Sequence, residues 1–171
     1  LTRPEIAVLL AYSKLALYDQ LLASSLPDDP AAVDDLLRYF PAPLSTRYRD
    51  AILRHRLRRE IIATVVTNSL ANGAGPAFVH DIAERSGASA EAIARAYFVV
   101  RRVFGLRDLW AEIEALDNRV EADVQYRMLR VTQQVILQAV LWLLRHAQPA
   151  IEIEKLIASY GDGIAELART I

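Results

Sequence analysis

"ADVQYRMLRVTQQVILQAVLWLLRH", residues 122–146, carries its apolar side chains at the spacing of an α-helix. Apolar residues recur every three or four positions along one stripe, formed by Val124, Met128, Val131, Val135 and Ala139. A helix has 3.6 residues per turn, so side chains at this spacing share one face. Pro149, which cannot continue a helix, follows the pattern. We therefore predict a long helix over about residues 120–147.

The first part of the chain predicts helices in the same way. Thr2 stands three residues before Glu5, which is the spacing of a capping box at the start of a helix. Pro27 ends this first helix. A second long helix is predicted over about residues 45–72, with Gly73 as its left-handed stop.

Shorter helices fill the remaining sequence. They are predicted over about residues 29–40, 76–86, 90–104 and 106–117, with two more in the tail on either side of "GDG" at 161–163. Residues 151–154, "IEIE", alternate as a strand would, but no second strand pattern is present to pair with them. The predicted fold class is all-α: a multi-helix bundle with two long helices, about 45–72 and 120–147, and several short ones.

Composition and charge restrict the classes of function. The chain of 171 residues suits one domain, and its hydrophobic content of 53% favours a piece that packs against something larger. The formal net charge of −1 creates no overall field that would attract DNA or anionic lipid. Because the chain has no cysteine, disulfides and thiolate metal sites are excluded, and a reducing, cytoplasmic location is expected.

The ends and the longest apolar run predict a soluble segment of a longer protein. The sequence begins with Leu1 rather than methionine, which we interpret as the sign of an excised segment. No signal-peptide pattern precedes the first helix. Residues 135–144 form the longest apolar run, which is far shorter than the roughly 18 residues of a membrane-spanning helix.

A basic cluster lies inside the second long helix predicted. Its members are Arg54, His55, Arg56, Arg58 and Arg59. On a continuous helix, Arg54 lies one turn from Arg58, and His55 lies one turn from Arg59, so the cluster forms two neighbouring columns. A charged helix face with ion pairs explains this pattern better than nucleic-acid binding, because the surrounding chain is slightly acidic. Arg54, Arg58 and Arg59 are the candidates for contacts with another domain or subunit.

Two further patterns resemble ligand sites. "NGAGPAF" at 72–78 has the glycines of a phosphate loop, but the element before it is a helix and no lysine follows. Residues 81–97 have the spacing of a helix-turn-helix with Gly87 in the turn. The helix that would read the DNA begins with Ala90, Glu91 and Ala92. The alanines offer no donors to bases, and the carboxylate of Glu91 repels phosphate. A plain helical hairpin is favoured, and DNA binding stays open as the alternative.

No pattern of catalytic or metal-binding residues is evident. The histidines, at positions 55, 80 and 146, are far apart and have no partner ligand three or four residues away. Ser13 and Ser69 are lone hydroxyls that we expect either to bond to the helix backbone or to be packed. The acidic pairs 34–35 and 152/154 are expected to be solvated. We therefore predict no catalytic, cofactor-binding or metal residue in this chain.

Several phrases of the sequence, taken in order, resemble one protein family. They are "LTRPEIAVLLAYSKLALYDQLLAS", "YFPAPL", "RHRLRREIIATVVTNSLAN", "GPAFVHDIAERSGAS", "ARAYFVVRRVFGLRDLWAEIEALDNRV" and "QYRMLR". Together they are similar to the C-terminal region of the large, multidomain bacterial NAD-specific glutamate dehydrogenases. The resemblance covers about residues 1–147 and thins from Pro149 onward.

The resemblance implies a function for the parent enzyme and a supporting role for this segment. The parent would oxidatively deaminate L-glutamate with NAD, giving 2-oxoglutarate, ammonium and NADH, in a catalytic domain upstream of this segment. No position here matches the family's catalytic or nucleotide-binding motifs, so the resemblance implies no cofactor in the segment itself. It implies a helical domain at 1–147 and a helical tail at 148–171, the upstream domain as partner, and a homo-oligomer.

Two other functions stay open on the sequence alone. One is an all-α DNA-binding regulator that uses the helix-turn-helix pattern at 81–97. The other is a stand-alone helical dimerisation module.

Overall fold

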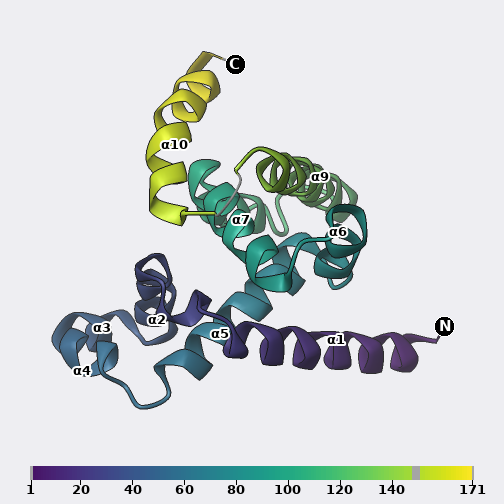
Figure 1. Cartoon of the computed structure of the whole chain (residues 1–171). Helices are drawn as coiled ribbons and strands as arrows, with labels where there is room; N and C mark the ends of the chain where they lie inside the picture. The colour runs from purple at the N-terminus through teal and green to yellow at the C-terminus, as the bar shows by residue number, and fades with distance from the viewer. Residues whose placement is uncertain (1, 148–150, 171) are drawn as a thin grey trace. The chain divides into compact units, whose positions relative to one another are not determined.

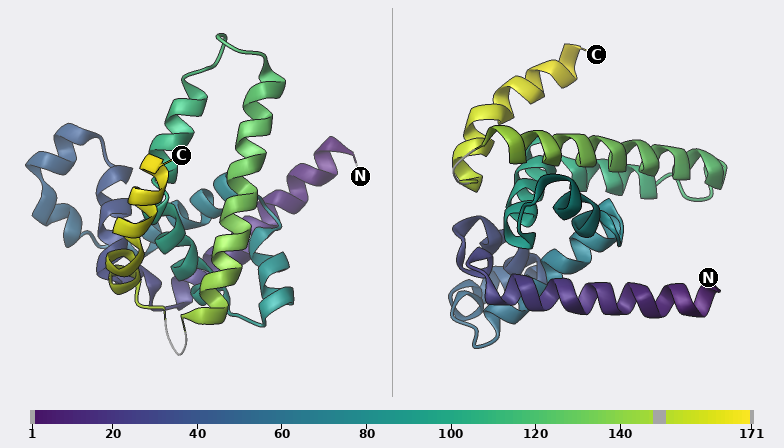
Figure 2. Two further views of the ribbon diagram at one scale, coloured as in Figure 1. Left: turned by 90° about the horizontal axis from the view of Figure 1, so that it is seen from above. Right: turned by 45° about the vertical axis from the view of Figure 1, so that its right-hand side comes forward.

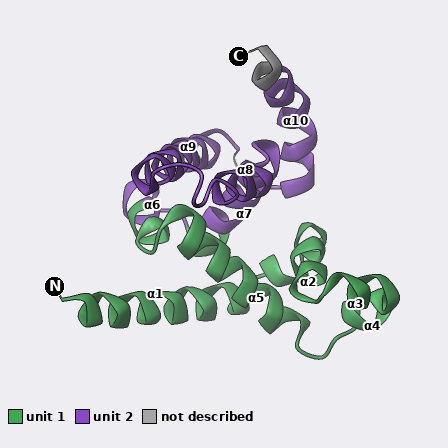
Figure 3. Ribbon diagram, turned by 180° about the vertical axis from the view of Figure 1, so that it is seen from behind, with its two compact units in different colours: residues 1–81, 89–91 green, residues 82–88, 92–171 purple. Residues whose placement is uncertain are grey.

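The fold of the described residues is all-α, as predicted. A computed structural model describes residues 2–147 and 151–170, and within them it contains helices and no strand (Figure 1). The chain divides into two compact units, which Figure 3 colours separately. Unit 1 comprises residues 1–81 and 89–91, and unit 2 comprises residues 82–88 and 92–171.

Unit 1 is organised around one central helix, α5. In chain order its elements are α1 (Arg3–Ala23), η1 (Leu26–Asp28), η2 (Pro30–Ala32), α2 (Val33–Tyr39), α3 (Ala42–Arg47), α4 (Arg49–Leu53), α5 (Arg58–Ser69) and the π-helical turn η3 (Leu70–Ala74). Helix α5 packs against α1 and α2. The side chains buried there include Leu21, Leu36, Ile62 and Val66, and removal of this apolar surface from water stabilises the unit.

The start of α1 shows the predicted capping box. The carboxylate of Glu5 accepts a hydrogen bond from the backbone N–H of Thr2 at 2.6 Å and another from its hydroxyl at 2.9 Å. These two bonds, the backbone one first, stabilise the ionised form and lower the pKa of Glu5 below its ordinary value. The cap therefore depends on an ionised carboxylate.

The rest of α1 is largely exposed. Its exposed apolar side chains include Ile6, Leu9 and Tyr12, and Tyr12 has 68% of its surface exposed. By length and composition α1 is also the one described helix apolar enough to cross a membrane. Its C-terminal half is held within unit 1, where the Lys14 ammonium donates hydrogen bonds to the side chains of Asn68 and Asn72.

The prediction of a second long helix over residues 45–72 was wrong. The chain leaves the helical conformation at Tyr48 and again between α4 and α5, where Leu57 has φ −101° and ψ 26°. At the second break the imidazole Nδ1 of His55 accepts a hydrogen bond from the N–H of Leu57 at 3.1 Å. This local bond replaces part of the helical ladder. Propensity alone favours a continuous helix, and tertiary packing overrides it.

The predicted stop at Gly73 was wrong by two residues. The π-helical turn η3 carries the chain past Gly73, and Gly75 takes the positive φ of 109°. The stops predicted at Gly87 and Gly105 are confirmed, with φ of 70° and 57°. Glycine is suited to these positions because it lacks the Cβ that clashes in the left-handed region.

Unit 2 contains the longest helix and most of α7. The helices are α6 (Phe78–Ser86), whose first turn belongs to unit 1, α7 (Ala90–Val103), α8 (Leu106–Glu114), α9 (Ala122–His146) and α10 (Ile153–Thr170). Figure 2 shows α8 and α9 side by side, joined by a turn. The fully buried side chains of this unit include Ile93, Tyr97, Phe98, Ile136 and Val140.

The long helix predicted over 120–147 is confirmed as α9, and its apolar stripe is not the face that packs. Val131 and Val135 of the predicted stripe are exposed, whereas Thr132, Ile136 and Val140 are buried. The helix carries apolar residues on more than one face, so periodicity alone did not select the face that packs. The exposed stripe leaves apolar surface on α9.

The tail also differs from its prediction. Two helices were predicted on either side of "GDG", but the single helix α10 continues through Gly161 and Gly163 without a break, and Ile153 lies in its first turn. Each helical glycine costs about 1 kcal/mol relative to alanine, which does not end a helix that packs one apolar face. Ile153 is buried, and Leu156, Ile157 and Ile164 are half-buried. The predicted start of the tail, residues 148–150, lies outside the described residues.

A pair of glycine substitutions tests the backbone of unit 2. Gly105→Ala should destabilise the chain by about 1 kcal/mol, because alanine is strained at positive φ. Gly161→Ala should stabilise it by about 0.5–1 kcal/mol, because a Cβ there meets open space on a regular helix. Urea unfolding of both variants beside wild type measures the difference, and the opposite order of stabilities would contradict the assignment.

The capping box predicts a graded change in the pKa of Glu5. Thr2→Ala removes the hydroxyl bond and should raise this pKa slightly, whereas Thr2→Pro also removes the N–H and should raise it further. Because the folded pKa lies below the unfolded one, the cap contributes stability above the unfolded pKa and loses it as the pH falls through the folded pKa. NMR titration of the carboxyl carbon measures this order, and equal pKa values in all three proteins would refute it.

Candidate functional site: the Asp28 arginine cluster

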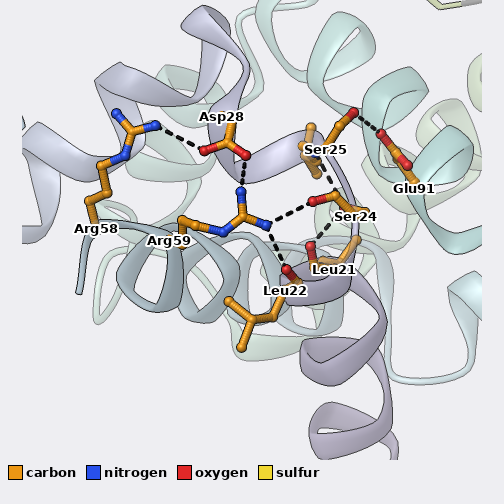
Figure 4. Close-up of polar contacts among 9 residues, drawn as sticks. Leu21, Leu22, Ser24, Ser25, Asp28, Arg58, Arg59 and Glu91 are labelled. Carbon is orange, nitrogen blue, oxygen red and sulfur yellow. Dashed lines mark hydrogen bonds and ion pairs between the residues drawn. The ribbon is translucent and has the colours of Figure 1, made fainter. Parts of the chain in front are cut away.

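Two arginines at the start of α5 meet one carboxylate from η1 (Figure 4). Arg58 Nη2 lies 2.9 Å from one oxygen of Asp28, and Arg59 Nη1 pairs with the other oxygen. We call Asp28, Arg58 and Arg59 the Asp28 cluster. All three side chains are between a third and a half exposed, so solvent screens the charges and the cluster has an open side.

Arg59 also binds the end of α1. Its Nη2 donates to the backbone carbonyl of Leu22 at 2.8 Å and to that of Ser24 at 3.0 Å. The last carbonyls of a helix have no partner within the helix, so a cation that binds them stabilises its end. One guanidinium therefore connects α1, η1 and α5, using the several donors that arginine presents in one plane.

The structure brings together two of the three predicted arginines. Arg58 and Arg59 share Asp28, whereas Arg54 lies exposed in the turn between α4 and α5. The predicted columns on a continuous helix are absent, because the helix is interrupted before Arg58. Contact of these arginines with another domain or subunit stays a prediction.

Asp28 is the member of the cluster that was not predicted from the sequence. It lies thirty residues before Arg58, so no helical spacing connects them. Two neighbouring residues indicate the local structure around Asp28. Pro27 places Asp28 in a tight turn, and Asp29 caps the start of η2 by accepting a hydrogen bond from the N–H of Ala31. These signals predict the turn but not the partner across it.

The two ligand-like patterns have structural roles in the described chain. Residues 72–78 run from the π-helical turn into α6, without the strand that a phosphate loop needs. Residues 81–97 comprise most of α6, a turn at Gly87 and the first half of α7, in which Ile93 and Tyr97 are buried. Glu91, which the DNA-binding alternative would place at phosphate, accepts a hydrogen bond from the Ser25 hydroxyl at 2.6 Å. The geometry therefore does not favour the DNA-binding alternative.

Most of the other polar candidates bond within the chain. The Ser13 hydroxyl donates to the carbonyl of Leu9 at 2.7 Å, as expected. Asp34 pairs with Arg38, and Glu154 pairs with Arg102, both at 2.8 Å. Asp35 differs from its prediction, because it is buried rather than solvated. Among the described residues, no group of three or more histidines and carboxylates is placed to hold a metal ion.

The described residues of unit 2 line two surface hollows of about 310 Å³ each, among others. The first is wholly apolar and lies among α7, α9 and α10, where Phe104, Trp142 and Tyr160 line it. The second lies between α8 and α9, where Glu114, Asp117 and Tyr126 are among the lining residues. The first suits an apolar contact, and the second suits a cationic group beside an aromatic ring.

Comparison with known families identifies the chain. The family described as "Glutamate dehydrogenase, C-terminal" matches residues 1–171. The chain belongs to this family. The resemblance predicted over about residues 1–147 is therefore confirmed, and the match extends through the tail.

Curated relatives of the chain are NAD-specific glutamate dehydrogenases. The chain is 43% identical over 145 residues to the one from Halomonas elongata, covering 85% of this chain and 9% of that protein. It is 40% identical over 167 residues to the one from Pseudomonas aeruginosa, covering 98% of this chain and 10% of that protein. It is 36% identical over 146 residues to the one from Mycobacterium tuberculosis, covering 85% and 9%. The chain thus spans about a tenth of the length of these relatives.

The geometry of the Asp28 cluster predicts unequal roles for its two arginines. Arg59→Ala should destabilise the chain by about 1–3 kcal/mol, because it leaves two carbonyls without their charged donor and removes one of the two partners of Asp28. Arg58→Ala should cost no more than about 1 kcal/mol, because its pair with Asp28 is half-exposed. Urea unfolding compares them, with Arg38→Ala as the control for a surface ion pair. Equal losses for Arg58 and Arg59 would contradict the helix-end role.

Proposed function

We propose that this chain is the non-catalytic C-terminal helical segment of an NAD-specific glutamate dehydrogenase, located in the cytoplasm. The parent enzyme would oxidise L-glutamate with NAD to 2-oxoglutarate, ammonium and NADH. The observation that supports this most directly is the family match over the whole chain, together with identities of 36–43% to curated dehydrogenases. NAD would bind in the part of the parent that lies outside this segment.

The helical fold favours a structural rather than a catalytic role for this segment. Dinucleotide-binding units place the cofactor at the carboxyl ends of parallel strands, next to a glycine-rich turn. The described residues contain helices and no strand, and Gly73 lies within the π-helical turn η3 while Gly75 directly follows it. Catalysis in the parent therefore requires other parts of the longer chain.

Exposed apolar surface supports packing against the upstream catalytic domain. The uncharged stretch 6–13 of α1 exposes Ile6, Leu9 and Tyr12, and a soluble protein covers a continuous apolar surface of this kind with a partner. The Asp28 cluster fixes the far end of the same helix. Arg58 and Arg59 are half-exposed beside this end of α1, and they would make polar contacts at the junction between this segment and the upstream domain. The parent would be a homo-oligomer.

An assay of the longer protein tests the proposal. Purified parent enzyme should form NADH from glutamate and NAD, measured by absorbance, whereas the 171-residue chain should form none and should bind no NAD in calorimetry. We expect activity in the parent and none in the 171-residue chain because the usual dinucleotide-binding units are built on a parallel sheet. NADH formation by the 171-residue chain, or none by the parent, would overturn it.

A charge reversal in the parent tests the junction. Arg58→Glu should change the assembly state or kcat/KM, because it places repulsive charge where we propose polar contacts while Arg59 keeps its bonds to the end of α1. Asp28→Asn is the control, since it breaks the internal pairs and keeps both cations. The same effect from both changes would assign these arginines to the fold of unit 1 alone.

A further inference from the structure

The helix interruption in unit 1 creates a strongly basic surface. Residues 42–57 contain four arginines and one aspartate, a net charge of +3 in a chain whose net charge is −1. We call the exposed Arg47, Arg49, Arg54 and Arg56 the basic lobe. Among the residues that the structure describes, no carboxylate forms an ion pair with any of the four. Their charge is therefore available to a partner.

The apolar side chains of this surface indicate a protein partner. Leu44, Tyr48 and Leu57 are nearly half exposed among the arginines, and the Arg47 guanidinium lies 5.3 Å from the Tyr48 ring centroid. Arginine and tyrosine are enriched where protein interfaces are buried, and leucine contributes apolar area there. A site for a bare phosphate would not need these apolar groups. The partner should therefore present carboxylates beside apolar surface.

Unit 2 of the same chain has a surface of that kind. Residues 108–123, from α8 to the start of α9, contain six carboxylates and one arginine, a net charge of −5. We call this segment the acidic hairpin. Of its acids, Asp123 pairs with Arg127, whereas Glu112, Glu114 and Glu121 have no ion pair among the described residues. Its apolar part includes the exposed Leu109 and Val120.

A hollow in the acidic hairpin suits an arginine side chain. The hollow between α8 and α9 measures about 310 Å³ and is lined by Glu114 and Asp117, with Tyr126 beside them. Two carboxylates can accept the planar donors of a guanidinium, and a tyrosine ring can stack on its face. Arginine anchors that enter such hollows contribute strongly to protein interfaces.

We propose that the basic lobe of one copy of this chain binds the acidic hairpin of a second copy, with an arginine of the lobe in the hollow beside Tyr126. The second copy is the occupant because its hairpin supplies the complementary charge, the apolar rim and the hollow. This contact joins two different surfaces, so it either occurs twice about a two-fold axis in a dimer or repeats head to tail as a closed ring or an open filament. It goes beyond the proposed function and does not depend on dehydrogenase activity.

Photo-crosslinking in the longer protein that carries this segment tests the contact. Tyr48→p-benzoylphenylalanine places a reactive ring in the lobe, and light protein carrying it is mixed with wild-type protein labelled with heavy isotopes. Crosslinked peptides should join light residue 48 to heavy residues 108–123. Crosslinks confined to one isotope, or directed to the upstream domain or any other segment, would overturn the proposal.

A charge exchange in the same assay tests the electrostatic complementarity. The lobe variant (Arg54→Glu, Arg56→Glu) and the hairpin variant (Glu112→Arg, Glu114→Arg) should each lose crosslinking between their own copies by about tenfold or more, because like charges then face each other. A mixture of the two should regain it, which also shows that both variants fold. Arg38→Glu, outside the lobe, should leave crosslinking unchanged. Unchanged crosslinking in either variant alone, or no recovery in the mixture, would overturn the proposal.

Discussion

Unit 1 depends on one guanidinium that joins three segments distant in sequence. Arg59 binds the Asp28 carboxylate and the carbonyls of Leu22 and Ser24, so the end of α1, the turn η1 and the start of α5 meet at one side chain. The apolar core of the unit lies beside this point, where Leu21 and Leu26 are buried. Burial supplies the larger share of the stabilising free energy, and the directional bonds fix the angle at which the helices meet.

Much of the fold could be predicted from the sequence because its signals are local. The capping box at Thr2 and the stops at Gly87 and Gly105 each depend on a few neighbouring residues, and all three are confirmed. The predicted helix over 45–72 failed because its interruption depends on distant groups. Ile52 is buried on one side of the break and Arg59 binds Asp28 on the other, so the chain must turn between them. Helical periodicity carries no information about such a constraint.

The candidate site was predictable only in part, for the same reason. A dense arginine run indicates a charged surface, and the structure places Arg58 and Arg59 in one cluster. Their partner Asp28 could not be found from spacing, because the two segments are brought together by the packing of α5 on α1. The face of α9 that packs could not be predicted from the sequence because of a related ambiguity. A helix that is apolar on more than one face shows which face packs only when its neighbours are known.

The interruption of the predicted long helix changes what its arginines can do. On a straight helix, each turn advances 5.4 Å, so Arg47, Arg54 and Arg58 would be spread along a rod. In the structure the chain turns at Tyr48 and again before Leu57, which separates the arginines into two sets. Arg58 and Arg59 pair with Asp28, Arg59 also binds the end of α1, and the four arginines before them are exposed. One basic run thus supplies both an internal anchor and an exposed surface, and its two parts differ because the backbone breaks between them.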